Sequence, residues 1–511
     1  MCKKQTQGYL KIFSTTLLPS HFRWLCLWLG VLGGFILMTD QITAQAPFNE
    51  QALDQFINQQ MATQRVPGLA LAIIQGDQVR MVKGYGAARA DQPVTPQTQF
   101  LVASLSKSFT AVAIMQMVEA GKLALDAPVQ RYLPEFTLAD PAAAQQITVR
   151  QLLNQVSGLS DAGFPAMRLP APKTAAERIT SLRAARLVAP PGKEYHYFDV
   201  NYQILARLVE VASGQPFSDY LQTHIFAPLQ MTHTVNLMTD RDIAQKPTNL
   251  AQGHLLAYTL PLASGEETGF MGGSSGIVTT AEDMAHYLIM QNNAGRFQGK
   301  QLLSAQSVAL LHTPPTNVNS PYAMGWLTAT TPSGVQTLEH NGILSTFYAE
   351  MVLLPATRQG FVLLYNIHSL AQDALGAPQI KDGLVDLLTG RQPKTGGFTV
   401  TTWAILMGAL TLLCVGLEIR GLVRLPRWRQ QAETKPLWRH LLNIIWSFVP
   451  AAFVLAMPAI VLSSAGRAYG YLTLFRSMLD SLGWLGLCAV LGVLNGLARL
   501  MWLLRQQSHG F

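Results

Sequence analysis

The chain reads FLVASLSKSFTAVAIMQMVEAG over residues 100–121, where a strand-like apolar run passes directly into a helical one. Within this stretch, Ser104 and Lys107 form the only Ser-x-x-Lys spacing in the sequence. Positions i and i+3 of a helix are neighbours, so the Lys107 amine can reach the Ser104 hydroxyl. A desolvated amine can accept the proton of a serine and turn its oxygen into a nucleophile. The stretch predicts a central buried helix with a reactive serine at its start.

A structural role accounts for the same residues. Ser104 could cap a helix that runs from about Ser106 to Ala120 and ends at Gly121. Chance alone supplies about one Ser-x-x-Lys spacing in a chain of this composition, so the motif needs support from elsewhere. In the catalytic interpretation, the unpaired N–H groups at the same helix start face a developing oxyanion.

The composition points to membrane segments. Only 13% of the 511 residues are charged, whereas 49% are hydrophobic, and this balance is typical of chains with apolar spans. Three uncharged runs close the chain, at residues 399–417, 441–464 and 481–498. Each is close to the length needed to cross the hydrocarbon core of a bilayer. We expect a membrane region of three transmembrane helices over residues 399–511.

The formal net charge of +8 reflects membrane topology. Basic residues gather between the first two runs, at Arg420, Arg424, Arg427, Arg429, Lys435 and Arg439, and after the last run, at Arg499 and Arg505. By the positive-inside rule, this loop and the C-terminus are cytoplasmic, and residues 47–398 face outward. The loop between the second and third runs carries only Arg467 and Arg476, offset by Asp480. The distribution gives no support to nucleic-acid binding.

Residues 1–46 carry the features of a secretory signal. A basic N-terminal stretch precedes the apolar run Trp24–Met38, and Ala44-Gln45-Ala46 is a small-x-small cleavage pattern. An uncleaved signal anchor fits the same residues and gives the same topology. The four cysteines, Cys2, Cys26, Cys414 and Cys488, all lie outside the external segment. We therefore expect no disulfide there and no zinc site.

The external segment has strand patterns at both ends and helical patterns between them. Residues 50–64 show helical spacing, and residues 68–75 and 79–85 form a predicted hairpin around Gly76-Asp77. Two strong strands return late, at residues 347–354 and 360–365. This order predicts an α+β domain at residues 47–390, in which both ends build one antiparallel sheet and a helical region is inserted. Residues 391–398 are the predicted linker to the membrane.

Further motifs follow the Ser-x-x-Lys in a fixed order. They are Gly121–Val129, Ile147–Leu153, Ser157–Leu159, Pro191–Tyr197, Pro228–Thr232, Thr279–Met284, Gly325-Trp326 and His340-Asn341-Gly342. Across about residues 50–390 the chain resembles the serine beta-lactamase-like family, which includes class C beta-lactamases, penicillin-binding D-alanyl-D-alanine carboxypeptidases and related esterases. The resemblance implies a beta-lactamase/transpeptidase-like fold.

The resemblance also implies roles for individual residues. Ser104 would be the acylated nucleophile and Lys107 its base or proton shuttle. Tyr197 matches the proton-transferring tyrosine of a Tyr-x-Asn motif; the alternative is a buried core tyrosine, a role that suits Tyr195 and Tyr202. The backbone N–H groups of Ser104 and Ile343 would form the oxyanion hole.

The third family motif, Lys-Thr-Gly or His-Thr-Gly, is matched by His340-Asn341-Gly342. These residues would bind substrate, with Gly342 allowing a substrate backbone to lie close to the strand. His340 as a simple surface histidine is the alternative.

Two positions depart from the family pattern. Asp199 stands where the second motif ends in Asn, and Asn341 replaces a threonine. An ionised Asp only accepts hydrogen bonds, and close to Lys107 it would favour the charged ammonium. Both departures argue against penicillin-like or D-Ala-D-Ala recognition, with Asp199 still a candidate substrate-binding residue. The same departures add weight to an ester or another D-amino-acid derivative as the substrate.

A second serine motif, Gly272-Gly273-Ser274-Ser275-Gly276, satisfies the Gly-x-Ser-x-Gly of a nucleophile elbow. That elbow needs a buried strand before the serine and a helix directly after it. Here a glycine-rich stretch precedes Ser274, and residues 277–279 intervene before a helix capped near Thr280. We expect no nucleophile at this position.

The sequence therefore predicts a membrane-anchored, extracytoplasmic serine hydrolase that acts through an acyl-enzyme on Ser104. Cell-envelope peptides or esters are the expected substrates, and the chemistry requires no metal and no organic cofactor. A binding or sensing protein that keeps the fold but does not turn over its acyl adduct is the alternative. Nothing in the sequence indicates an oligomeric state.

Overall fold

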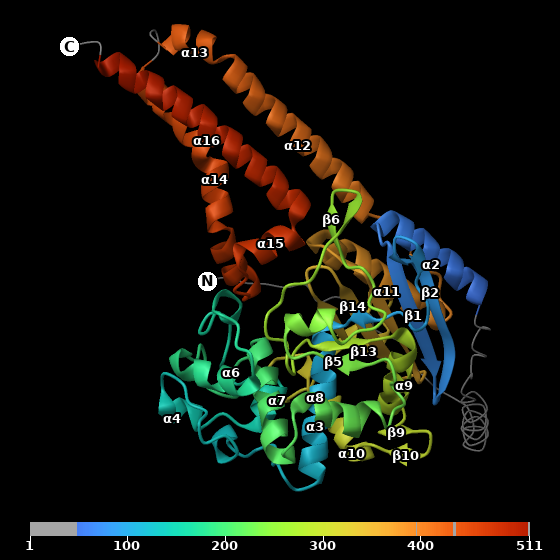
Figure 1. Ribbon diagram of the computed structural model, residues 1–511. Helices are drawn as coiled ribbons and strands as arrows, with labels where there is room; N and C mark the ends of the chain where they lie inside the picture. Colours follow the sequence, from blue (N-terminus) through green and yellow to red (C-terminus); the bar gives the residue numbers. More distant parts are fainter. Residues whose placement is uncertain (1–48, 395, 433–435, 509–511) are drawn as a thin grey trace, which may run out of the picture. The chain divides into compact units, whose positions relative to one another are not determined.

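The computed structural model describes residues 49–394, 396–432 and 436–508. Its central element is an antiparallel sheet of eight strands in the order β11-β12-β13-β14-β15-β1-β2-β3 (Figure 1). The strands are β1 Gly68–Gln75, β2 Gln78–Arg89, β3 Gln92–Pro93, β11 Tyr322–Ala323, β12 Trp326–Thr330, β13 Gln336–Ile343, β14 Tyr348–Leu354 and β15 Gln359–Tyr365. The predicted signal segment at residues 1–46 lies outside the described residues.

Strands from both ends of the external segment meet at the middle of this sheet. β1 pairs antiparallel with β15, and Leu69 lies opposite Tyr365 in their register. β14 and β15 are buried along their whole length, which agrees with their nearly unbroken apolar sequence because helices cover both faces. The predicted α+β class and the sheet built from both ends of the domain are confirmed.

Helices α2 (Glu50–Gln64) and α11 (Ala377–Leu388) cover one side of the sheet. The Asn49 side chain caps α2 by accepting a hydrogen bond from Ala52 N at 3.0 Å. The two helices meet where Gly383 of α11 faces the ring of Phe56. The predicted helix at residues 50–64 and the hairpin after it agree with the structure.

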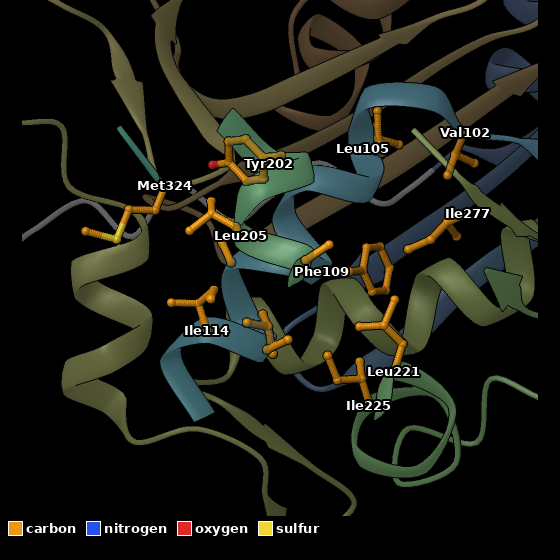
Figure 2. Packing of buried hydrophobic residues seen from close by; sticks show 14 of the residues in the cluster. Val102, Leu105, Phe109, Ile114, Tyr202, Leu205, Leu221, Ile225, Ile277 and Met324 are labelled. Carbon is orange, nitrogen blue, oxygen red and sulfur yellow. The ribbon is translucent and has the colours of Figure 1, made fainter. Parts of the chain in front are cut away.

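Helix α3 (Ser106–Glu119) runs through the middle of the domain, and almost every side chain on it is buried. The Phe109 ring stacks on Tyr287 of α9 (Ala281–Asn292), with ring centroids 3.8 Å apart. Figure 2 shows Leu221 and Ile225 gathered near Phe109 from a different part of the chain. A helix that is apolar on all sides is stable only inside a core, and the predicted central buried helix is confirmed.

The remaining elements form the helical insertion and small peripheral sheets. The helices are α4 Pro141–Ala144, α5 Val149–Leu153, α6 Ala175–Ser181, α7 Asp199–Ser213, α8 Phe217–Leu221 and α10 Ala305–Leu311. The short strands are β4 Phe100–Leu101, β5 Val235–Asn236, β6 His254–Ala257, β7 Leu260–Ala263, β8 Ile277–Thr279, β9 Arg296–Phe297, β10 Lys300–Gln301 and β16 Ile367–His368. Strands β4, β8 and β5 form a small sheet, in which β4 lies just before the turn that leads into α3.

Three helices are long and apolar enough to cross a membrane within the described residues: α12 Val400–Val423, α14 Leu437–Ala465 and α16, whose spanning part is Leu479–Arg505. They carry exposed apolar side chains such as Leu412, which is 77% exposed, as expected of a lipid-facing surface. Two short helices, α13 (Leu425–Ala432) and α15 (Tyr471–Ser477), connect them. All three coincide with predicted runs, while the predicted domain boundaries stay predictions.

Candidate active site

The turn that carries Ser104 is a single 3-10 turn, Ala103–Leu105, between β4 and α3. Ala103 has a left-handed φ of +47°, which is strained for a residue with a side chain. Two backbone hydrogen bonds brace the turn, from Val102 N to Ile277 O and from Leu105 N to Val102 O, both 3.1 Å. Neither helix start has a side-chain cap, so Ser104 is not a helix cap. The Ser104 hydroxyl therefore has no capping role and is available as a candidate nucleophile.

Lys107 projects from the first turn of α3 and is fully buried. Its Nζ lies 2.9 Å from Ser104 Oγ, 2.6 Å from Asp199 Oδ1 and 3.0 Å from Ser274 O. Burial lowers the pKa of the Lys107 amine, and the carboxylate of Asp199 opposes this shift. The structure thus brings the predicted nucleophile and base into hydrogen-bonding distance.

The carbonyl of Ser274 comes from the glycine-rich segment 272–276. Two hydroxyls of α3 fix this segment: Thr110 Oγ1 donates to Gly273 O at 2.7 Å, and Ser106 Oγ accepts from Ile277 N at 3.0 Å. β8 then intervenes before α9, whose N-cap is Thr280. The Gly-x-Ser-x-Gly motif therefore lacks the strand and helix that a nucleophile elbow needs, as predicted. Its contribution to the site is the backbone carbonyl of Ser274, which sequence reasoning missed.

Tyr197 lies directly before α7, and its ring centroid is 4.9 Å from Lys107 Nζ. Burial and the charge of Asp199 raise the pKa of its phenol. Tyr202 is a buried core tyrosine whose hydroxyl donates to Leu153 O at 2.8 Å, and Tyr195 stacks on Tyr322. The Tyr202 ring also faces the Lys107 amine, at 5.9 Å, but the Tyr197 ring is nearer and the Tyr197 hydroxyl contacts the hydroxyl of Ser104.

Asp199 is the first residue of α7. One of its oxygens accepts from Lys107, and the other accepts from Arg467 at 2.6 Å. Burial on its own would raise the pKa of this carboxyl, but the two cations hold it below its usual range. The expected closeness of the Asp199 carboxylate and the Lys107 amine is present. Substrate binding by Asp199 stays a prediction.

His340 lies in β13 and is only 1% exposed, so the surface-histidine alternative is wrong. Its Nδ1 donates to the carbonyl of Asn341 at 2.6 Å, and its Nε2 lies 3.3 Å from the Tyr322 hydroxyl. A carbonyl only accepts, which assigns the proton to Nδ1. Burial and the nearby Lys107 charge lower the pKa of His340 to about 3, and the imidazole is therefore neutral.

Gly342 brings β13 against the nucleophile turn. A Cβ at this position would lie 2.1 Å from Val102 O and 3.1 Å from Ser104 N. The glycine permits the close approach of the Ser104 turn, and its predicted role of admitting a substrate backbone stays a prediction. Asn341 and Ile343 project from the other face of the strand by alternation. Their predicted roles in substrate and oxyanion binding stay predictions.

Sequence reasoning did not assign two charged residues, Arg467 and Asp161, to the site. Arg467 follows α14, and its Nε lies 3.1 Å from Asp161 Oδ2, while its guanidinium carbon is 5.4 Å from the Tyr197 ring centroid. Burial raises the pKa of Asp161 to about 6. A signal was present in the sequence, because Arg467 is a cation in a loop where the positive-inside rule disfavours one.

A family model described as Beta-lactamase matches residues 53–384. The chain belongs to the beta-lactamase family. This family is of the serine hydrolase type, which agrees with the Ser104–Lys107 pair. The protein flp of Staphylococcus aureus (strain MW2) is 28% identical over 335 residues, which is 63% of this chain and 64% of flp.

Two further members support the assignment. Penicillin-binding protein 4 of Amycolatopsis lactamdurans is 29% identical over 48% of this chain and 65% of that protein. The octameric penicillin-binding protein homologue from Pyrococcus abyssi has a similar structure, with a TM-score of 0.58 and 26% identity over 68% of this chain and 78% of that chain. The match to flp leaves about a third of that relative uncovered.

Proposed function

We propose that the protein is a membrane-anchored, extracytoplasmic serine hydrolase that forms an acyl-enzyme on Ser104. The observation that carries this proposal is the distance of 2.9 Å between Lys107 Nζ and Ser104 Oγ, in a chain of the beta-lactamase family. The neutral amine accepts the Ser104 proton as the oxygen attacks a substrate carbonyl. Water or an amine then takes the acyl group.

The contacts of Lys107 suit both states of its amine. As an ammonium it has three N–H groups for its three neighbours, Ser104 Oγ, Asp199 Oδ1 and Ser274 O. A neutral amine has two N–H groups for the carboxylate and the carbonyl, and its lone pair then faces the Ser104 hydroxyl. No rearrangement of heavy atoms is needed for proton transfer, which keeps the reorganisation cost of the reaction low.

Other groups of the site would bind the oxyanion, protonate the leaving group and contact the substrate. Backbone N–H groups of Ser104 and Ile343 would bind the oxyanion, since the end of β13 lies close to the Ser104 turn. The phenol of Tyr197, protonated because its pKa is raised, would donate a proton to the leaving group. Neutral His340 offers no charge to a substrate carboxylate, which favours esters or other uncharged acyl groups from the cell envelope.

A fluorescent fluorophosphonate tests the nucleophile. Purified full-length protein should label covalently, and Ser104→Ala should lose the label because the attacking oxygen is gone. Ser106→Ala is the matched control, since Ser106 lies two residues away and binds the backbone of Ile277. Equal labelling of Ser104→Ala and the wild type would disprove the mechanism.

A second candidate function is a penicillin-binding or sensing protein that does not turn over. The contact of 2.6 Å between Asp199 and Lys107 favours it, because a carboxylate at that distance stabilises the ammonium and weakens the base. Steady-state hydrolysis separates the two candidates. Stoichiometric labelling without turnover on D-Ala-D-Ala peptides, D-alanyl esters and short-chain esters would support the sensing role.

A further inference from the structure

The connection between α14 and α15 docks against the helical insertion of the hydrolase domain. Arg168 binds both the connection and α14 itself: its Nε donates to Tyr469 O at 3.1 Å, and a terminal nitrogen donates to Pro458 O inside α14 at 3.0 Å. The backbone N–H of Ala468 binds the carboxylate of Asp161. These contacts, mostly to backbone atoms, hold the segment that carries Arg467 beside the active site.

Arg467 reaches the same carboxylate that holds the base. Its terminal nitrogen donates to Asp199 Oδ2 at 2.6 Å, while Lys107 binds Oδ1 at the same distance. The Arg467 side chain is 16% exposed. The charged and titratable groups that face this cluster are Lys107, Asp161, Arg168, Tyr195, Tyr197, Asp199, His340 and Tyr469.

The charges of the site give a physical reason for a cation, Arg467, beside Asp199. Asp199 stands where the family motif has a neutral Asn. This chain therefore carries one additional negative charge beside Lys107, the proposed base. An unopposed carboxylate would keep Lys107 protonated and unable to accept the Ser104 proton. Arg467 brings one positive charge to the opposite oxygen of the same carboxylate, and a shared carboxylate holds each cation less strongly.

We propose that Arg467 is a positioning residue of the active site, which neutralises Asp199 and thereby lets Lys107 act as the base for Ser104. The inference rests on the hydrolase function proposed above. It makes the site composite, because the hydrolase domain supplies the nucleophile and base while the membrane region supplies the compensating charge.

The electrostatics give the direction of the effect. Burial is the main cause that lowers the pKa of Lys107, and Arg467 lowers it further, while Asp199 raises it. Removing Arg467 should therefore raise this pKa. Because the neutral amine is the active form, the acidic limb of the pH–rate profile should move to higher pH.

The test compares full-length variants in detergent by their rate of fluorophosphonate labelling from pH 5 to 10. Arg467→Gln should shift the acidic limb upward by about one pH unit, which is about a tenfold loss at pH values below the limb. Arg467→Lys keeps the charge and should recover most of the profile. Arg476→Gln is the control, because Arg476 lies in α15, the helix that follows the connection, and binds the carbonyl of Gly265 instead.

A double variant separates charge compensation from mere docking. Asp199→Asn removes the additional negative charge, so Asp199→Asn/Arg467→Gln should label about tenfold faster at neutral pH than Arg467→Gln alone. If Arg467 only held the connection in place, the loss of its contacts would persist in the double variant.

The outcomes distinguish this inference from the hydrolase proposal. Absence of Ser104-dependent labelling in the wild type would overturn both. Ser104-dependent labelling in the wild type, with an unchanged pH profile in Arg467→Gln or no recovery in the double variant, would overturn the role of Arg467 alone.

Discussion

At the scale of single residues, the raised pKa of Tyr197 decides what its phenol can do. Burial and the charge of Asp199 both stabilise the protonated phenol, so in the proposed mechanism it would act as a proton donor. Its ring is near two cations, with the ring centroid 4.9 Å from Lys107 Nζ and 5.4 Å from the guanidinium carbon of Arg467. These contacts fix the ring and leave the hydroxyl beside Ser104.

Tyr197→Phe tests this role. The change keeps the ring and its packing but removes the donor, so we expect ester hydrolysis to slow by about 100-fold. Melting temperature should change little. Steady-state kinetics on an activated ester measure the effect, with Tyr195→Phe as the matched control because Tyr195 packs on Tyr322. A Tyr197→Phe variant as fast as Tyr195→Phe would refute the assignment.

At the scale of elements, three segments converge on the 3-10 turn at residues 103–105. β8 holds it through the carbonyl of Ile277, the segment 272–276 supplies an acceptor to Lys107, and β13 lies against its backbone at Gly342. The left-handed Ala103 is stable because these neighbours hold the turn from different sides.

Gly342→Ala should disrupt this convergence. The new Cβ would overlap Val102 O at 2.1 Å, so the strand or the turn must move. Overpacking of this kind costs about 1 to 3 kcal/mol of stability. We expect a lower melting temperature together with markedly slower fluorophosphonate labelling.

The matched control for this change is Gly265→Ala, where a Cβ meets nothing within 4 Å. This variant should keep both the melting temperature and the labelling rate. If Gly342→Ala behaved in the same way, the close approach of β13 to the nucleophile turn would not matter for catalysis.

At the scale of the whole molecule, the docked connection fixes which loops share a side of the membrane. Arg467 contacts Asp161 and Asp199, so residues 466–470 lie on the side of the hydrolase domain. α13, with its basic residues, connects the opposite ends of α12 and α14. That the basic loop is cytoplasmic and the domain faces outward stays a prediction of the positive-inside rule.

Accessible cysteines test this orientation. In a chain whose natural cysteines are replaced by serine, Glu194→Cys in the hydrolase domain should react with a membrane-impermeant maleimide in intact cells. Arg429→Cys in α13 should react only after permeabilisation. Both positions are exposed, so access depends on the membrane alone. Labelling of Arg429→Cys in intact cells would reverse the topology.

The elements that sequence reasoning located are those with a strong local signal. The helix at residues 50–64 has a cap and an apolar stripe, and the two hairpins have clear turn residues, so their patterns specify them directly. Ser104, Lys107 and Tyr197 were predicted as site residues from the order in which the motifs follow one another along the chain. Arg467 and Ser274 were missed because their partners lie far away in sequence.

The sequence by itself determined the α+β class and the apolar spans and predicted the nucleophile and its base, because spacing, periodicity and charge distribution are local properties. Only the tertiary structure decided how the charge of Asp199 is balanced. That balance depends on a contact across 268 residues between Asp199 and Arg467. The tertiary structure also decided that the carbonyl of Ser274 accepts a hydrogen bond from Lys107, which no side-chain pattern reveals. Electrostatic compensation acts through space, and chain folding alone brings these groups together.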